Sequence, residues 1–296
     1  MDLLAAMASF IRVAETGSFS AVSREAGGSQ PTISRHIALL ERHFDVRLFN
    51  RTTRSLTVTE DGRSLLVYAR QIEETLEQAE NALGRRRMAP KGLVRLGATT
   101  AFGLYLTGRI AGLLDQYREL TVELVMRDSF GDMVEEGLDL AVRIGLPAEG
   151  SLIARHMSDV ERVLVVAPAY LEGRPVPSEP KDLLAHACIT FTYGTPDREW
   201  HFSRDEIVQT VSADGPFHAN NSEAVHKAAL AGLGFALLPI YQIEAELASG
   251  QLLHVMPDWH APPLRLHAVY PGPRTLPLRV RTVLDFLLKL PLNSRS

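Results

Sequence analysis

The sequence contains very little cysteine and no long apolar run. Its single cysteine, Cys188, excludes an intrachain disulfide and any cysteine pair that could bind a metal or act as a redox couple. The apolar neighbours in "LAHACITF" predict a buried, unreactive thiol. No apolar stretch reaches the roughly 18 to 20 residues of a membrane span, and the N-terminus lacks the features of a signal peptide. We therefore expect a cytoplasmic protein that does not bind a membrane.

The sequence also lacks the short motifs of common enzyme classes. It has no GxSxG, no P-loop and no GxGxxG, and "GLGFALLP" carries only two of the glycines of the last motif. The ten histidines are scattered, without an HExxH or a comparable ligand cluster. We expect no catalytic residue, no metal and no cofactor.

Length and charge suggest several domains with one basic region. With 296 residues, 46% of them hydrophobic, the chain can bury more than one core. The net charge is −4, yet residues 24–54 carry six arginines against three acidic residues, with His36 and His43 beside them. Such a patch can hold phosphates even in an acidic chain. An ordinary solvated surface is the alternative.

Helical spacing predicts three short helices in the first 44 residues. The first has its apolar residues at Leu3, Met7, Phe10 and Ala14. A second, roughly 19–26, follows Ser18 as its N-cap and ends at Gly27 and Gly28. A third begins after Ser29, another N-cap candidate, and buries a stripe formed by Ile33, Ile37, Leu40 and Phe44.

The second and third helices, joined by the glycine turn, form a predicted helix-turn-helix. Pro31 lies in the first turn of the third helix, where a missing N–H costs little. The side chains that face away from the apolar stripe, and can therefore bind base edges or phosphates, are Gln30, Thr32, Ser34 and Arg35. A plain helical bundle with a polar outer face is the alternative.

A predicted hairpin favours the DNA-binding alternative. "VRLFNRTTRSLTVTEDG" has a β-rich run on each side of a polar tip, which is typical of the wing of a winged helix-turn-helix. The tip residues, which can reach phosphates or a minor groove, are Arg51, Thr52, Thr53 and Arg54.

A long helix follows, from about Glu60 to Arg87. Its apolar residues have heptad spacing, at Leu65, Ala69, Ile72, Leu76, Ala79 and Leu83. Such a helix, about 40 Å long, most simply pairs with its copy in a second chain. The alternative is that the stripe packs on its own domain. Pro90 and Gly92 then indicate a hinge.

Beyond the hinge, expected strands and helices alternate. The expected strands are 93–99, 121–128, 139–146, 162–168, 187–193, 198–203, 207–213, 235–239 and 264–271, and the expected helices are 100–120, 129–138, 221–234 and 276–290. The order of the first region predicts a parallel α/β sheet, and the second alternating region predicts a second α/β lobe. Two such lobes usually leave a ligand cleft between them.

With these elements in place, the chain resembles the LysR-type transcriptional regulators over essentially its full length. The resemblance is carried by "GSFS", "SQPTISRHIALLE" and "LFNRTTRSLTVTEDG", and by later phrases such as "EEGLDLAVRIG" and "ALAGLGFALLP", which are closest to the CrgA-like subgroup. It implies a winged helix-turn-helix domain at 1–60, a dimerising linker helix at 61–87 and a hinge at 88–92. The implied α/β effector domain at 93–296 is of the periplasmic-binding-protein-like type 2, with lobe 1 at about 93–161 and 266–296 and lobe 2 at about 162–265.

The resemblance also assigns site residues by position. The residues that it places in the DNA-binding site are Ser29, Gln30, Pro31, Thr32, Ser34 and Arg35 at the start of the recognition helix, and Arg51 in the wing. The residues that it places around the effector cleft are Thr99, Thr100, Ser129, Phe130, Phe202, Asn221 and Ser222. Helix N-termini and hydroxyls there suggest a small carboxylate or an aromatic acid. Alternatively, Thr99 and Asn221 are simple helix caps and Phe202 belongs to a core.

Three residues of the helix-turn-helix depart from the family pattern. Ala26 stands where leucine is usual, Gly28 replaces a larger apolar residue, and Ser23 replaces a common alanine. Losing a buried leucine side chain typically costs about 2 to 5 kcal/mol unless neighbours refill the space. We therefore expect a looser helix-turn-helix than in related chains.

The predicted function is that of a transcriptional regulator. We expect a homodimer or homotetramer that binds double-stranded promoter DNA and responds to a small-molecule effector between the two lobes. The alternatives are a solute-binding protein that works without DNA, against which the helix-turn-helix argues, and an enzyme built on the α/β lobes, for which the motifs are missing.

Overall fold

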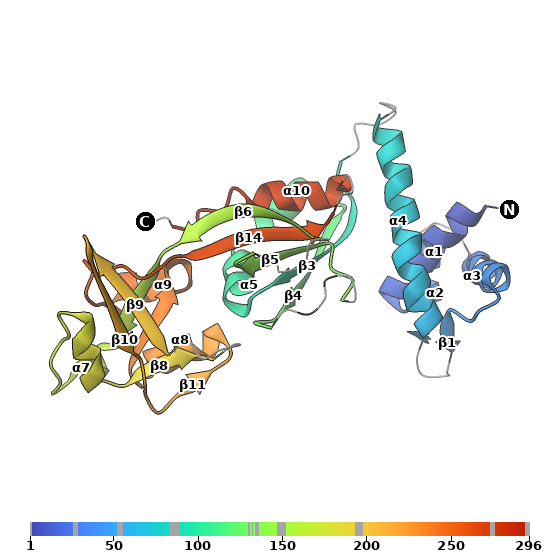
Figure 1. Ribbon diagram of the computed structural model, residues 1–296. Coiled ribbons are helices and arrows are strands. Elements are labelled where there is room, and N and C mark those ends of the chain that lie inside the picture. Colours follow the sequence, from blue (N-terminus) through green and yellow to red (C-terminus); the bar gives the residue numbers. More distant parts are fainter. Residues whose placement is uncertain are drawn as a thin grey trace. The chain divides into compact units, whose positions relative to one another are not determined.

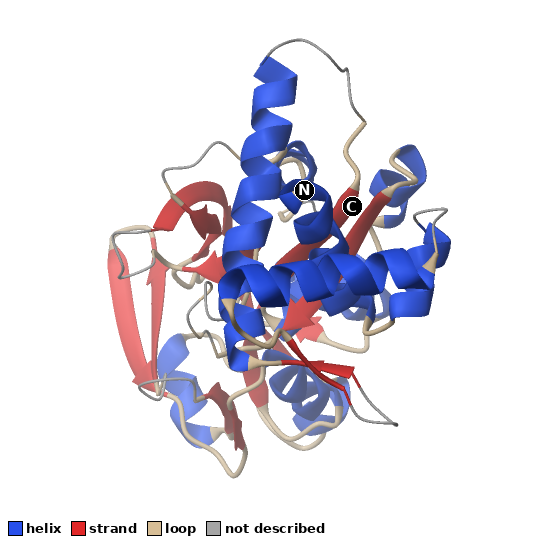
Figure 2. Cartoon of the chain, turned by 90° about the vertical axis from the view of Figure 1, so that its right-hand side faces the viewer, coloured by secondary structure: helices blue, strands red, loops and turns tan. Residues whose placement is uncertain are grey.

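The computed structural model describes residues 2–25, 29–51, 56–82, 89–129, 131, 133, 136–146, 152–192, 198–272 and 276–293. The chain divides into two compact units, Met1–Met88 and Ala89–Ser296, each of which is described by itself (Figure 1). The described part of the first unit is almost entirely helical, whereas the second mixes helices and strands (Figure 2). No helix in the described ranges is long and apolar enough to cross a membrane.

Three helices build the core of the N-terminal unit, namely α1 (Leu3–Thr16), α2 (Phe19–Glu25) and α3 (Gln30–Phe44). As expected, the Ser18 hydroxyl caps α2 by accepting a hydrogen bond from the Ala21 N–H at 3.2 Å. Ile33, Ile37 and Leu40 of α3 are buried in this core, in agreement with the predicted stripe. The prediction for Phe44 was wrong, because its side chain is 40% exposed at the end of the helix.

The expected hairpin is present as β1 (Phe49–Arg51) and β2 (Leu56–Val58), which pair in antiparallel register. Ser23 is one of the three departures from the family pattern, and it is buried. Its hydroxyl donates a hydrogen bond to the Ser20 carbonyl at 3.0 Å, so this buried polar group has a partner. Ala26 and Gly28 lie outside the described residues, so the expectation of a looser turn stays a prediction.

The stripe of the long helix α4 (Glu60–Ala82) divides into two parts. Leu65 and Leu66 pack against the core of the N-terminal unit, and Ala69 is fully buried in it. Further along, Ile72 and Leu76 are 38% and 43% exposed. The alternative that the stripe packs on its own domain therefore holds for the first part of the helix, and pairing with a second chain stays a prediction for the exposed part. Leu83 and the Arg85–Arg87 run lie outside the described residues.

The first sheet of the C-terminal unit has the strand order β4-β3-β5-β14-β6. Its strands are β3 (Gly92–Ala98), β4 (Leu120–Met126), β5 (Leu140–Ile144), β6 (Leu152–Val160) and β14 (Leu264–Pro271). Its helices are α5 (Thr100–Thr107), α6 (Ala111–Gln116) and α10 (Leu278–Leu287). β3 is parallel to β4 and β5, whereas β14 is antiparallel to β5 and β6.

The second sheet has the order β11-β8-β12-β7-β13, and a separate hairpin lies beside it. The sheet strands are β7 (Arg162–Val166), β8 (Cys188–Phe191), β11 (His218–Ala219), β12 (Phe235–Pro239) and β13 (Leu253–His254). The hairpin consists of β9 (Glu199–Arg204) and β10 (Ile207–Ser212). The helical segments are α7 (Pro168–Leu171), the 3-10 helix η1 (Pro180–Ala185), α8 (Ser222–Leu230) and α9 (Ile240–Ser249).

Several expectations for the C-terminal unit need correction. Both sheets are mixed rather than parallel, because the long strands β6 and β14 run antiparallel and β7 is antiparallel to β12. The helix expected at 100–120 is two helices separated by a turn that begins at Gly108, a poor helix former. The described residues within 129–138 lie in turns, a bend or irregular backbone and not in a helix. The strand β6 and the helix α9 were not predicted.

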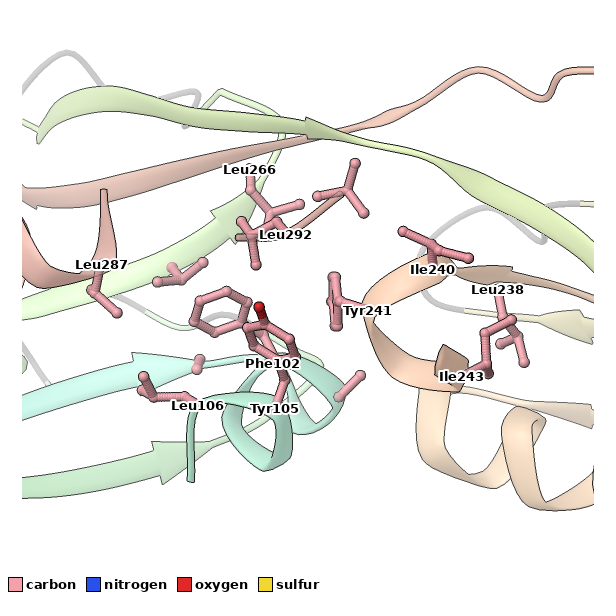
Figure 3. Packing of buried hydrophobic residues seen from close by; sticks show 14 of the residues in the cluster. Phe102, Tyr105, Leu106, Leu238, Ile240, Tyr241, Ile243, Leu266, Leu287 and Leu292 are labelled. Carbon is pink, nitrogen blue, oxygen red and sulfur yellow. The ribbon is translucent and has the colours of Figure 1, made fainter. Parts of the chain in front are cut away.

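One apolar core continues from the first lobe into the second. Phe102 and Tyr105 of α5 meet Tyr241 of α9, with ring centroids 6.1 Å and 5.2 Å from that of Tyr241 (Figure 3). Aromatic contacts of this geometry add to the stability that burial alone provides. The N-termini of the helices in both lobes are therefore held by one shared packing arrangement.

Gly62, in the first turn of α4, has no room for a side chain. A Cβ atom there would clash with the backbone oxygen of Leu48 and lie 2.7 Å from Cγ1 of Val58. We expect Gly62→Ala to lower the free energy of unfolding by about 1 to 3 kcal/mol in urea titrations of the full chain. Gly112→Ala is the control, because that helical glycine faces open space. Equal stability of both variants would contradict this packing.

The reactivity of the Cys188 thiol tests whether β8 is buried as the structure shows. Its side chain is buried in β8, and burial raises the pKa of the thiol to about 12. At pH 8 only about one thiol in ten thousand would then be the reactive thiolate. We expect no reaction of the native chain with Ellman's reagent at this pH and one equivalent of thiol after denaturation. Rapid labelling of the native protein would show that β8 is accessible.

Candidate functional site

The start of α3 presents a polar, exposed face. Gln30, Pro31, Thr32 and Arg35 are exposed, and Ser34 is half-buried. This arrangement follows from the helical period, because the buried residues of α3 all lie on the opposite side. The structure therefore places these five predicted DNA-binding residues on one accessible turn-and-a-half of helix.

Local hydrogen bonds order the beginning of this face. Ser29 occupies the N-cap position of α3, but its hydroxyl makes no capping bond to the backbone. Instead it lies 3.0 Å from the hydroxyl of Thr32, and the Ser29 carbonyl accepts from the Thr32 N–H at 2.9 Å. The Ser20 hydroxyl of α2 donates to Oε1 of Gln30 at 3.4 Å, which connects the two helices of the motif.

The predicted wing contacts are only partly described. Arg51 lies at the end of β1, and nothing is described of its side chain. Thr52, Thr53 and Arg54 lie outside the described residues. The first strand of the wing begins at the core residue Phe49, within the segment predicted as the first β-rich run.

A cavity of about 350 Å³ lies in the C-terminal unit, between the two lobes. Ten of its lining residues are apolar, namely Ala101, Ile144, Ile189, Phe191, Trp200, Val225, Leu237, Leu238, Pro239 and Leu264. Its polar lining residues are Thr99, Asp128, Arg162, Ser222 and Tyr241. An apolar body with a few placed polar groups is typical of small-molecule sites.

Thr99 and Thr100 lie at this cavity or beside it, at the start of α5. The Thr99 hydroxyl caps the helix by accepting from the Phe102 N–H at 3.4 Å. Burial raises the pKa of Tyr241, and the nearby Asp128 carboxylate raises it further, so this phenol stays protonated. Thr100 donates its N–H to Oδ1 of Asp128 at 2.8 Å.

Asn221 and Ser222 start α8 on the opposite wall. Asn221 caps the helix, because its Oδ1 accepts from the Ala224 N–H at 2.9 Å. Its Nδ2 donates to Oδ2 of Asp128 at 2.6 Å and to the Thr100 hydroxyl at 3.1 Å. Asn221 therefore caps α8 and also forms hydrogen bonds that connect the two lobes. The Ser222 hydroxyl donates to Gln242 at 2.9 Å.

The other predicted effector residues are not brought into this site. Phe202 is 1% exposed and belongs to a core cluster of the second lobe without lining the cavity, so the alternative that it is a core residue describes its position. Ser129 is exposed and does not line the cavity. Phe130 lies outside the described residues. Trp200, two residues before Phe202 on the same strand, is the aromatic residue of β9 that lines the cavity.

Sequence reasoning missed Asp128, Arg162 and Tyr241. Asp128 closes the segment predicted as a strand at 121–128, so an acidic residue at a strand end was a usable signal. Tyr241 lies in a helix that was not predicted, and its apolar surroundings gave no sign of a cleft. Among the described residues, no group of three or more His, Cys, Asp and Glu side chains could hold a metal ion.

Family models match both units of the chain. The model described as "Bacterial regulatory helix-turn-helix protein, lysR family" matches residues 4–63. The model described as "LysR substrate binding domain" matches residues 88–291. The exposed helix face and the inter-lobe cavity thus fall within the parts of the chain that these two descriptions cover.

Relatives and solved structures agree with these matches. The HTH-type transcriptional regulator PtxR of Pseudomonas aeruginosa is 33% identical over 279 residues, 94% of this chain and 89% of PtxR. DmlR of Escherichia coli is 31% identical over 97% of this chain and 94% of its own length. The full-length structure of the Vibrio cholerae virulence activator AphB has a TM-score of 0.60 at 27% identity, covering 97% of this chain and 99% of AphB. That of CrgA from Neisseria meningitidis has a TM-score of 0.63 at 26% identity, covering 96% and 97%.

These findings confirm the resemblance found in the sequence, including the likeness to CrgA. The relatives carry the names of transcriptional regulators, and the helix-turn-helix at the N-terminus fits that activity. The chain belongs to the LysR family of transcriptional regulators.

Proposed function

We propose that this regulator changes its action on promoter DNA when a small organic molecule binds between its two lobes. The observation that supports this most strongly is the inter-lobe cavity, because residues from both lobes line it. A ligand that contacts both walls stabilises one lobe arrangement over others, and its differential affinity is the free energy available for regulation. DNA as the target implies action in the cytoplasm.

The DNA contacts that we propose come from the exposed face of α3 and from the wing. Ser29, Gln30, Pro31, Thr32, Ser34 and Arg35 would enter the major groove, with Arg51, Thr52, Thr53 and Arg54 on the backbone or in the minor groove. Arg35 is the cation of the α3 set and can bind guanine with two hydrogen bonds.

The exposed part of α4 supports a homodimer. Tyr68, Ile72 and Leu76 are 62%, 38% and 43% exposed, although Ile72 and Leu76 continue the heptad stripe that is buried earlier in the helix. An apolar stripe on a long helix is best covered by a second such helix. We propose that two chains pair here, within a dimer or a tetramer.

The lining of the cavity favours an aromatic acid over a small, wholly polar carboxylate as effector. Its walls are mostly apolar, with Phe191, Trp200 and Tyr241 among them. Arg162 is the cationic residue among the described residues of the lining, and its Nε donates to the Pro262 carbonyl at 2.9 Å. We propose that the effector's ring contacts the aromatic walls, that its acidic group faces Arg162, and that Thr99, Thr100, Asn221 and Ser222 complete the site.

We expect Arg35→Ala to weaken binding to a duplex selected by this protein from a random pool. If the side chain reads a base, the loss is about 1 to 3 kcal/mol, which is about 5- to 150-fold in Kd. Arg42→Ala is the control, because that side chain lies near the other end of α3 with its Nε on the Ala38 carbonyl. Gel-shift titrations measure both. Unchanged affinity of Arg35→Ala would refute the role of Arg35.

Tryptophan fluorescence tests the effector site. The two tryptophans belong to the same buried cluster, but Trp200 lines the cavity, whereas Trp259 is not among the lining residues and lies beside Arg204. In a Trp259→Phe variant, we expect phenylacetate or cyclohexanecarboxylate to change the emission of Trp200 in a saturable way. Trp200→Phe, which keeps Trp259, should not respond. The same response from both variants, or from neither, would contradict binding of these acids in the cavity.

A further inference from the structure

We propose that Asp128 is a specificity-determining residue of the inter-lobe cavity, because its carboxylate occupies the position where a ligand carboxylate would otherwise bind. The cavity therefore selects ligands that carry no carboxylate at the starts of α5 and α8. This inference rests on the proposed function, since it names the ligand class of the same site.

The hydrogen bonds of Asp128 come from the first residues of both helices. Oδ1 accepts the Thr100 N–H of α5 at 2.8 Å. Oδ2 accepts the Asn221 Nδ2–H at 2.6 Å and the Ser222 N–H of α8 at 3.3 Å. Both carboxylate oxygens are thus engaged, and two of the three donors are backbone N–H groups at helix N-termini.

Helix N-termini favour an anion, because their first N–H groups lack intrahelical acceptors and carry the positive end of the helix dipole. Here a single carboxylate from the chain itself meets two such ends at once. A free carboxylate entering this place would have to displace Asp128 and would bring a second negative charge next to it. The protein's own side chain therefore prevents the anion binding that helix starts and hydroxyls suggested in the sequence.

The same carboxylate also connects the lobes. Asp128 and Thr100 belong to the first lobe, whereas Asn221 and Ser222 belong to the second. The Asn221 amide bridges to the Thr100 hydroxyl as well, at 3.1 Å. Ser222 is in turn bonded to Gln242, which donates to the Ser222 carbonyl at 3.2 Å. Closure of the lobes at this edge is therefore built into the chain and does not need an anionic ligand.

The residues that line the cavity beside Asp128 indicate which class of ligand fits there. Its remaining walls are apolar and aromatic, and its cation, Arg162, belongs to β7 and not to either helix start. A fitting ligand has an apolar or aromatic body, and any acidic group that it carries faces Arg162. Near Asp128 it presents a neutral group or a hydrogen-bond donor.

Chemical rescue tests this assignment. We expect Asp128→Gly in the full chain to lower the Tm by roughly 5 °C, because it removes the anion and leaves its donors unsatisfied. Sodium acetate, compared with sodium chloride at equal ionic strength and neutral pH, should restore much of this loss by occupying the vacated position. Acetate should not raise the Tm of the unchanged protein, in which Asp128 fills that position.

Asp128→Asn is the matched control, because it keeps the volume of the side chain but not its charge. It should be destabilised and should not respond to acetate, since no space is opened. If Asp128→Gly does not yield folded protein, Asp128→Ala with sodium formate makes the same test. Acetate stabilising the unchanged protein as much as the glycine variant would overturn the proposal, as would the absence of rescue in both the glycine and alanine variants. These melting experiments do not involve DNA, so failure of the proposed function would appear separately, in the gel shifts.

Discussion

The shared core of the two lobes is the constraint on which the C-terminal unit depends. Phe102 and Tyr105 of α5 pack against Tyr241 of α9, within one continuous set of buried residues. This packing fixes where α5 starts, and the sheet behind it fixes the end of β4, from which Asp128 follows. The polar contacts between the lobes are short because apolar burial has already brought their backbones together. The apolar core therefore positions the residues of the site, and the Asp128 carboxylate supplies the negative charge between the starts of α5 and α8.

Segments with strong local patterns could be predicted from the sequence. The stripe of α3 gave its helix, and the alternating apolar run of β14 gave its bounds, because both signals lie within a few residues. The strand β6 escaped prediction since only one of its nine residues is fully buried, so its sequence lacks a clear apolar pattern. Its neighbour β14, about a hundred residues later, is what makes it a strand. Pairing over such distances leaves little trace in local sequence.

The candidate site could likewise be predicted only where its residues carry a local sequence signal. Thr99, Thr100, Asn221 and Ser222 could be located because helix starts have recognisable residues. Asp128 could not be connected with Asn221, because 93 residues separate them and only the folded core brings them together. Phe202 and Trp200 show a finer limit: both are buried on β9, and the sequence cannot tell which of two inward-facing aromatic rings meets the cavity.

The apolar stripe of α4 is buried in one part of the helix and exposed in the next, and this division has a consequence for DNA binding. Ala69 is buried in the same core as Ile33 and Ile37 of α3, while Ile72, one turn later, is exposed. The first part of α4 therefore packs on the same core as α3, whereas its apolar stripe is exposed further along. Under the proposed pairing of two chains, substitutions in the exposed part of α4 would change the relative placement of the two α3 helices through residues that are not among the proposed DNA contacts.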